Sequence, residues 1–267
     1  MNSFNSRLAR SIQSKKSHLC IGLDISPEGM QDNSATIEDL KLHTKKVINA
    51  TQDLAVAFKP NLGFFERWGS IGFQWLEETL DLIDSNTLII GDAKRGDIGN
   101  TAKQYAKSLF DHFGFDAVTL SPYMGYDSIQ PFISDPLKGA FILCRTSNPS
   151  ASDFQNIETK KNKLFESVAK ACYEWNTNDN IGLVVGATAS EEILKVRKHA
   201  PGLPLLIPGI GKQGGDLKKS MIYGNNNGIS IINISRSIIF PPDLSENSIR
   251  NAAKEYVSSM REIIDDK

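Results

Sequence analysis

The chain has 267 residues, of which 40% are hydrophobic and 23% are charged, the mixture of an ordinary globular protein. Thirty basic residues against 31 acidic ones leave a net charge of −1, which argues against a dedicated nucleic-acid-binding protein. The sequence contains no apolar run as long as the roughly 18 residues that a membrane-spanning helix needs, so we expect no membrane association.

The N-terminal segment, residues 1–18, predicts an amphipathic helix and lacks the apolar run of a secretory signal peptide. The cysteines Cys20, Cys144 and Cys172 are odd in number and lack the spacing of metal ligands. These features favour a protein of the reducing cytoplasm, without structural disulfides.

Short apolar segments alternate with amphipathic segments along the rest of the chain. Each apolar segment is nearly continuous in hydrophobicity, which is typical of a parallel strand buried on both faces. The expected strands are His18–Asp24, Ala55–Asn61, Thr87–Lys94, Asp116–Ser121, Gly139–Ser147, Ile181–Thr188, Pro204–Gly209 and Ile229–Arg236. The clearest expected helices are Ile37–Asp53, Gly69–Asp84, Asn100–Gly114, Lys160–Trp175, Ser190–His199 and Leu244–Ile264.

This alternation predicts a single (β/α)8 barrel, a TIM barrel, that spans residues 1–267. A doubly wound open sheet is the alternative, because it has the same alternation of strands and helices. The polar segment 148–163 is expected to form a surface loop, and a glycine-rich loop, 209–215, follows the seventh expected strand.

Polar side chains gather where the expected strands end. Asp24, Lys59, Ser147 and Arg236 lie at four of these ends. Each has a simpler interpretation, as a helix cap, a lysine reaching solvent, a turn residue or a surface ion pair. In a barrel, however, the C-terminal strand ends meet on one open face, so their convergence favours a shared site there.

The third expected strand ends in the pattern Asp92, Lys94 and Asp97. Residues two apart in a strand point to the same side, so Asp92 and Lys94 should face the same space. Strand periodicity does not place Asp97, which follows an expected turn at Gly96. The alternative is a salt bridge at the strand end, with Asp97 as a helix cap.

A phosphate site is predicted between the ends of the seventh and eighth strands. The segment 208–216 is rich in glycine, whose backbone N–H groups can approach an anion closely. Arg236 would add a cation on the neighbouring strand, and barrels often bind phosphate at this place. An ordinary flexible loop is the alternative.

At this point the sequence resembles the orotidine 5′-phosphate decarboxylase family, in its bacterial subgroup of longer chains. The matching segments occur in family order, and their combination is far more specific than any one of them. They are Gly22–Asp24, Phe58–Asn61, Gly91–Thr101, Arg145–Ser150, Pro208–Asp216 and Ser235–Arg236.

The resemblance implies a barrel that removes CO2 from orotidine 5′-monophosphate to give UMP, the last step of pyrimidine nucleotide synthesis. It implies that the enzyme uses no metal and no organic cofactor. It also implies a homodimer with a shared active site, to which the partner subunit would contribute Asp97, Ile98 and Thr101.

The resemblance assigns a role to each matched residue of the reaction centre. Lys94 would donate a proton to C6 of the pyrimidine, and Asp92 would lie near the departing carboxylate. Lys59 would join this charge network and touch the ribose, while Asp24 would bond to a ribose hydroxyl. Ser147 would bond to the pyrimidine amide.

Other matched residues would hold the ends of the substrate. Gln213 would bridge the base and the phosphate, Arg236 would bind the phosphate, and Thr188 would brace Gln213. Thr101 of the partner subunit would bond to a ribose hydroxyl.

Two other functions remain open from the residues. A 3-keto-L-gulonate 6-phosphate decarboxylase has a similar Asp-x-Lys-x-x-Asp element but uses Mg²⁺; Ser147 and Gln213, which suit a pyrimidine nucleotide, argue against it. A non-catalytic nucleotide-binding dimer is the second alternative, and the intact Lys94 with its carboxylates argues against that.

Overall fold

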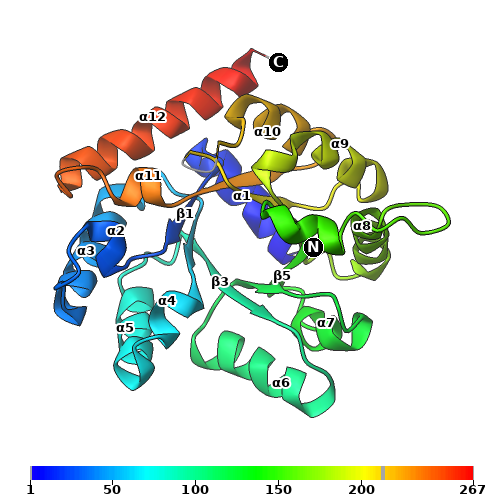
Figure 1. The fold of residues 1–267 in the computed structure, drawn as a ribbon, viewed down its shortest axis with the longest axis horizontal. Helices are drawn as coiled ribbons and strands as arrows, with labels where there is room; N and C mark the ends of the chain where they lie inside the picture. The colour runs from blue at the N-terminus through cyan, green and yellow to red at the C-terminus, as the bar shows by residue number, and fades with distance from the viewer. Residues whose placement is uncertain (1, 212–213, 267) are drawn as a thin grey trace.

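Eight parallel strands pair in chain order and close into a barrel in the computed structural model of the protein, which describes residues 2–211 and 214–266 (Figure 1). The last strand pairs with the first, so the predicted (β/α)8 barrel is confirmed and the open doubly wound sheet was wrong. The strands are β1 Leu19–Leu23, β2 Ala57–Pro60, β3 Leu88–Arg95, β4 Ala117–Leu120, β5 Gly139–Arg145, β6 Ile181–Val185, β7 Leu205–Pro208 and β8 Ser230–Ile234.

Helices form an outer ring around these strands (Figure 1). The longer ones are α3 Ile37–Thr51, α5 Gly69–Asp81, α6 Gly99–Lys107, α7 Tyr126–Ile133, α8 Leu164–Trp175, α9 Ser190–His199, α10 Leu217–Gly224 and α12 Glu246–Asp265. Short helices α2 Pro27–Met30, α4 Leu62–Glu66 and α11 Arg236–Ile239 lie in the connections, as do single turns at Ser108–His112, Pro149–Asp153 and Ala187–Ala189. None of the helices in the described ranges is both long and apolar enough to cross a bilayer.

Local signals explain where helices begin. Thr36 and Asp39 form a reciprocal capping box at the start of α3, which satisfies backbone N–H groups that the first turn leaves without partners. The predicted helix start at Lys160 was wrong. The Glu166 carboxylate accepts the Lys163 N–H at 2.7 Å, and α8 begins only after this cap, at Leu164.

Side chains alternate between two apolar layers, as strand geometry requires. Ile21, Phe58 and Ile232 point outward and pack under the helices. Cys20 and Ala57 belong to a separate cluster inside the barrel, which includes the other inward-facing residues Ile90, Phe141, Leu206 and Ile231.

The N-terminal helix α1, Phe4–Lys15, closes one end of the barrel, and its prediction is confirmed. Phe4, Leu8 and Ile12 are buried in the cluster inside the barrel, and the Phe4 ring meets Phe141 edge to face with centroids 5.9 Å apart. Among the described residues, this packing fills the end opposite the C-terminal strand ends and leaves the C-terminal end open for a site.

Candidate active site

Strand alternation carries two charged side chains into the mouth of the barrel. Lys59 lies two residues after the inward-facing Ala57, and Asp92 lies two residues after the inward-facing Ile90. Lys59 is only 4% exposed and Asp92 only 9% exposed. Such burial is unusual for charged residues unless they are paired.

Asp92 is bonded to two ammonium groups at once. Its Oδ2 lies 2.5 Å from the Nζ of Lys59, and its Oδ1 lies 2.5 Å from the Nζ of Lys94. The Lys94 side chain is 48% exposed, so Lys94 is the solvent-accessible end of the charged cluster Lys59, Asp92 and Lys94. The arrangement therefore presents one cation to whatever enters the barrel mouth.

The two buried groups hold each other in their charged forms. Burial by itself would lower the pKa of Lys59, but the carboxylates of Asp92 and Asp24 outweigh it and raise that pKa. Burial by itself would raise the pKa of Asp92, but Lys59 and Lys94 outweigh it and lower that pKa. Both groups are consequently ionised throughout the neutral range.

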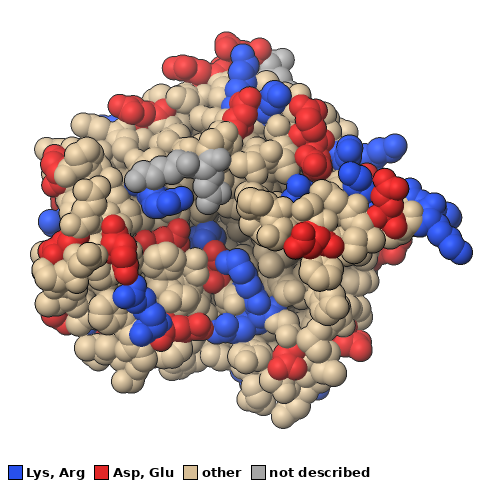
Figure 2. All heavy atoms as spheres, in the orientation of Figure 1, with Lys and Arg blue, Asp and Glu red and all other residues tan. Residues whose placement is uncertain are grey.

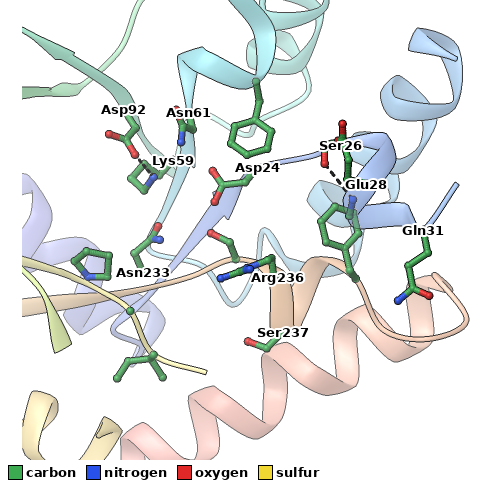
Figure 3. A pocket seen from close by; sticks show the side chains of 17 residues that line it. Asp24, Ser26, Glu28, Gln31, Lys59, Asn61, Asp92, Asn233, Arg236 and Ser237 are labelled. Carbon is green, nitrogen blue, oxygen red and sulfur yellow. Dashed lines mark hydrogen bonds and ion pairs between the residues drawn. The ribbon is translucent and has the colours of Figure 1, made fainter. Parts of the chain in front are cut away.

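Two adjoining cavities open from this centre and share Lys59, Asp92 and Pro208 in their walls. The first, of about 550 Å³, continues past Asp24 and Arg236. Figure 3 shows the Lys59–Asp92 ion pair at one end of it and Gln31 at the other. Figure 2 shows basic and acidic side chains close together where this face of the molecule is hollowed.

The second cavity, of about 530 Å³, has a different chemistry. Lys94, Ser147 and Thr188 line it together with an apolar floor. That floor is made by Leu143, Val184 and Leu206. The second cavity therefore suits a flat, partly polar ring, whereas the first suits a more polar and anionic group.

Buried polar atoms without partners point into the same region. Asp24 Oδ1, in the wall of the first cavity, and Ser147 Oγ, in the wall of the second, accept and donate no hydrogen bond within the described part of the chain. Leaving such an atom unsatisfied costs about 1–3 kcal/mol. Gly186 makes room for the serine, because a Cβ there would lie 2.0 Å from Ser147 Oγ. Both atoms are placed to bond to a ligand.

A family model described as "Orotidine 5'-phosphate decarboxylase / HUMPS family" matches residues 17–250. The chain belongs to this family. It is 45% identical to an orotidine 5′-phosphate decarboxylase of Dehalococcoides mccartyi, over 98% of this chain and 97% of the relative. The resemblance inferred from the motifs is thereby confirmed, and the chain is an enzyme of the decarboxylase family.

Solved structures agree with this assignment. A Leishmania donovani OMP decarboxylase is 38% identical, with a TM-score of 0.85 over 97% of this chain and 98% of that one. A Leishmania donovani UMP synthase is 39% identical, with a TM-score of 0.88 over 98% of this chain, which spans 57% of that longer protein.

Within this decarboxylase fold, the three residues expected from a partner subunit lie apart from the cavities. Asp97, Ile98 and Thr101 line neither of them. Asp97 Oδ1 accepts the N–H of Ile98 at 2.8 Å, and the Ile98 side chain is 50% exposed. No ion pair joins Asp97 to Lys94 within the described part of the chain. The expected role of Gln213 falls outside the described residues.

The cavities also contain residues that the sequence analysis did not single out. Asn61 and Asn233 line the first cavity, and Thr119 lines the second. Asn233 and Thr119 lie at inward-facing positions of expected strands, so the alternation that identified Asp92 could have identified them.

Within residues 2–211 and 214–266, no group of three or more His, Cys, Asp or Glu side chains lies close enough together to hold a metal ion.

Proposed function

We propose that this enzyme removes CO2 from orotidine 5′-monophosphate to give UMP, with Lys94 as the residue that stabilises and protonates C6. The observation that carries the proposal is the chain of charges Lys59–Asp92–Lys94, which ends in an ammonium half exposed in the second cavity. The family membership and the names of the relatives support the same reaction.

The two cavities suit the two ends of this substrate. The pyrimidine would lie in the second cavity over Leu143, Val184 and Leu206, with Ser147 Oγ bonded to its amide. The ribose would lie across Lys59 and Asp24, whose Oδ1 lacks a partner among the described residues. The phosphate of the substrate would reach Arg236 and the backbone at Gly209. Gln213 would bridge the base and the phosphate, and Thr188 would support Gln213.

Decarboxylation leaves an electron pair on C6 that the ring cannot delocalise well. The bond from C6 to the carboxylate carbon breaks, CO2 leaves, and the pair stays on C6. A fixed ammonium beside that atom stabilises the developing charge. A proton then passes from Lys94 Nζ to C6, and water later returns a proton to the lysine. Asp92 holds the Lys94 ammonium in place by their ion pair, and Lys59 in turn holds the Asp92 carboxylate.

In this proposal the reaction requires neither a metal ion nor an organic cofactor, because Lys94 supplies the positive charge that stabilises C6. The same chemistry distinguishes it from decarboxylation of a sugar phosphate through a Mg²⁺-stabilised enediolate. Treatment with EDTA should leave the rate of turnover unchanged, and strong inhibition would favour the metal-dependent alternative.

The active site would be completed by a second copy of the chain, with Asp97, Ile98 and Thr101 reaching across the interface. Support comes from the exposure of apolar side chains on and near α6, including Ile98 at 50% and Tyr105 at 37%. The loop that follows β4 adds Tyr123 at 88% and Met124 at 47%. A face of this kind is typical of a protein–protein interface. The homodimer and the cytoplasmic location remain predictions.

The decisive experiment is the loss of orotidine absorbance when the protein is mixed with orotidine 5′-monophosphate. We expect turnover by the wild type and none by Lys94→Ala, which should keep the wild-type circular dichroism spectrum. Absence of turnover at micromolar wild-type enzyme would support a non-catalytic nucleotide-binding protein. Near-normal turnover by Lys94→Ala would remove the assigned proton donor.

A further inference from the structure

One buried hydroxyl contacts both Asp92 and Lys94 of the charged cluster Lys59, Asp92 and Lys94. Thr119 is 2% exposed; its Oγ1 lies 2.9 Å from Asp92 Oδ1 and 3.0 Å from the backbone N of Lys94. The ionised Asp92 can only accept, so the threonine O–H donates to it and the threonine oxygen accepts the lysine N–H. A single side chain of β4 thus bridges two residues of β3.

The backbone at Lys94 needs such support. Its φ of 48° lies in the left-handed region, which is unfavourable for residues other than glycine. The pairing of β3 with β4 runs from Gly91 opposite Val118 to Arg95 opposite Leu120, so β3 bulges between these points. Within this bulge the Lys94 N–H donates a hydrogen bond to the Thr119 side chain. Strained backbone of this kind persists only where its surroundings hold it.

The bulge has a consequence for the ammonium. In a regular strand, Asp92 and Lys94 would project side by side from the same face. Here the backbone of Lys94 departs from strand geometry, and its Nζ lies 2.5 Å from Asp92 Oδ1, the oxygen that Thr119 also contacts. The Thr119 hydroxyl therefore contacts both the backbone N–H of Lys94 and the carboxylate oxygen that binds the Lys94 ammonium.

We infer that Thr119 is a positioning residue for the decarboxylation: its hydroxyl holds the Asp92 carboxylate and fixes the left-handed turn that presents the Lys94 ammonium to the second cavity. The inference rests on the proposed function. It extends that function to a residue of the cavity wall that acts on the reaction through Asp92 and Lys94.

Small errors in the placement of a catalytic group have large effects on rate, because the reacting atoms must be almost in contact. The hydroxyl also supplies the third hydrogen bond to Asp92, beside the two ammonium groups. That bond helps to keep Asp92 fixed and charged when the carboxylate of the substrate lies next to it. Its loss should therefore slow the chemical step more than it weakens binding.

The test compares Thr119→Val, which keeps the shape of the side chain, with Thr119→Ser, which keeps the hydroxyl. For Thr119→Val we expect a decrease in kcat of about 10- to 100-fold and a change in KM of less than about threefold, as for loss of a hydrogen bond to a charged group. Thr119→Ser should stay within about threefold of wild type in kcat, since the bond is retained. Thr119→Ala serves as a second deletion if the valine variant does not fold.

A matched control is Thr79→Val. Thr79 is 1% exposed, and its Oγ1 donates to the Trp75 carbonyl at 2.8 Å within α5, on the outside of the barrel. This control should keep the wild-type kcat even if its unfolding midpoint decreases. A loss of kcat in Thr79→Val equal to that in Thr119→Val would mean that any lost buried hydroxyl has the same effect, and would overturn the inference.

Crystal structures of the Thr119 variants give a result that does not depend on turnover. In Thr119→Val or Thr119→Ala we expect Lys94 to leave the left-handed region and its Nζ to move away from Asp92. Unchanged Lys94 geometry in these variants would overturn the inference, as would a serine variant as slow as the valine variant. If the wild type fails to act on orotidine 5′-monophosphate, the proposed function fails, while these structures still decide whether Thr119 positions Lys94.

Discussion

Replacing Asp92 by asparagine should destabilise the protein because it leaves a buried ammonium without its nearest counter-ion. The Lys59 side chain is 6% exposed, and its Nζ lies 2.5 Å from Asp92 Oδ2. Asparagine has the same shape but one acceptor oxygen, so its NH2 group would face one of the two lysines. Asp24 is the other carboxylate that stabilises the charged form of Lys59.

The size of the effect follows from burial. Removing one partner of a buried ion pair costs about 3–5 kcal/mol of stability. Loss of the second ion pair, with the half-exposed Lys94, adds at most about 1 kcal/mol to that cost. The carboxylate of Asp24 still stabilises charged Lys59 in the variant, so we expect a loss of about 3 kcal/mol in the free energy of unfolding at pH 7. For a domain of this size that loss corresponds to a decrease in Tm of roughly 6–12 °C.

The dependence on pH provides a second check. The pKa of Asp92 is lowered in the folded state, so its contribution is present above the unfolded value of 3.8 and is lost as pH falls through the folded value. The pKa of Lys59 is raised, so its contribution is present below 10.5 and is lost as pH rises through the folded value. The difference between wild type and variant should be constant from about pH 5 to 9 and should narrow in more acidic solution.

Urea unfolding followed by circular dichroism at pH 5, 7 and 9 measures these differences. Asp53→Asn is the matched control, because Asp53 pairs with Arg250 at 2.8 Å while both side chains are more than a third exposed. That control should lose less than about 1 kcal/mol. An Asp92→Asn variant as stable as the wild type at pH 7, or a difference that grows as pH falls toward 4, would refute the reasoning.

Three further outcomes are expected. Arg236→Ala should lower kcat/KM for orotidine 5′-monophosphate mainly through a higher KM, because the arginine binds the phosphate; an unchanged kcat/KM would exclude that role. Lys94→Ala and Asp97→Ala chains, each inactive alone, should recover about a quarter of wild-type activity when subunits exchange at equal concentration, since half the dimers are hybrids with one intact site. No recovery despite exchange verified by mass spectrometry would argue against a shared site. Phe4→Ala should lower the free energy of unfolding by about 3–5 kcal/mol in urea titrations, because the ring is fully buried at the closed end of the barrel; a change below about 1 kcal/mol would contradict that packing.

Local patterns in the sequence were sufficient for the barrel and for much of the candidate site. The expected strand Thr87–Lys94 contains nearly all of β3, because a parallel strand covered on both faces must be apolar along its whole length. The period of two then placed Asp92 and Lys94 on one side. In contrast, α7 and α10 were missed, since each has eight residues and α7 contains Pro131, too short or too interrupted to show a helical period.

Only the tertiary structure determined how the charged and polar groups meet. Lys59 and Asp92 are 33 residues apart in the chain, and Thr119 and Asp92 are 27 apart. Their contacts depend on the register between neighbouring strands and on the bulge in β3, which gives Lys94 its left-handed backbone. Composition and periodicity describe one segment at a time. Register is set by the packing of all eight strands around a closed barrel, so it could not be read from any segment alone.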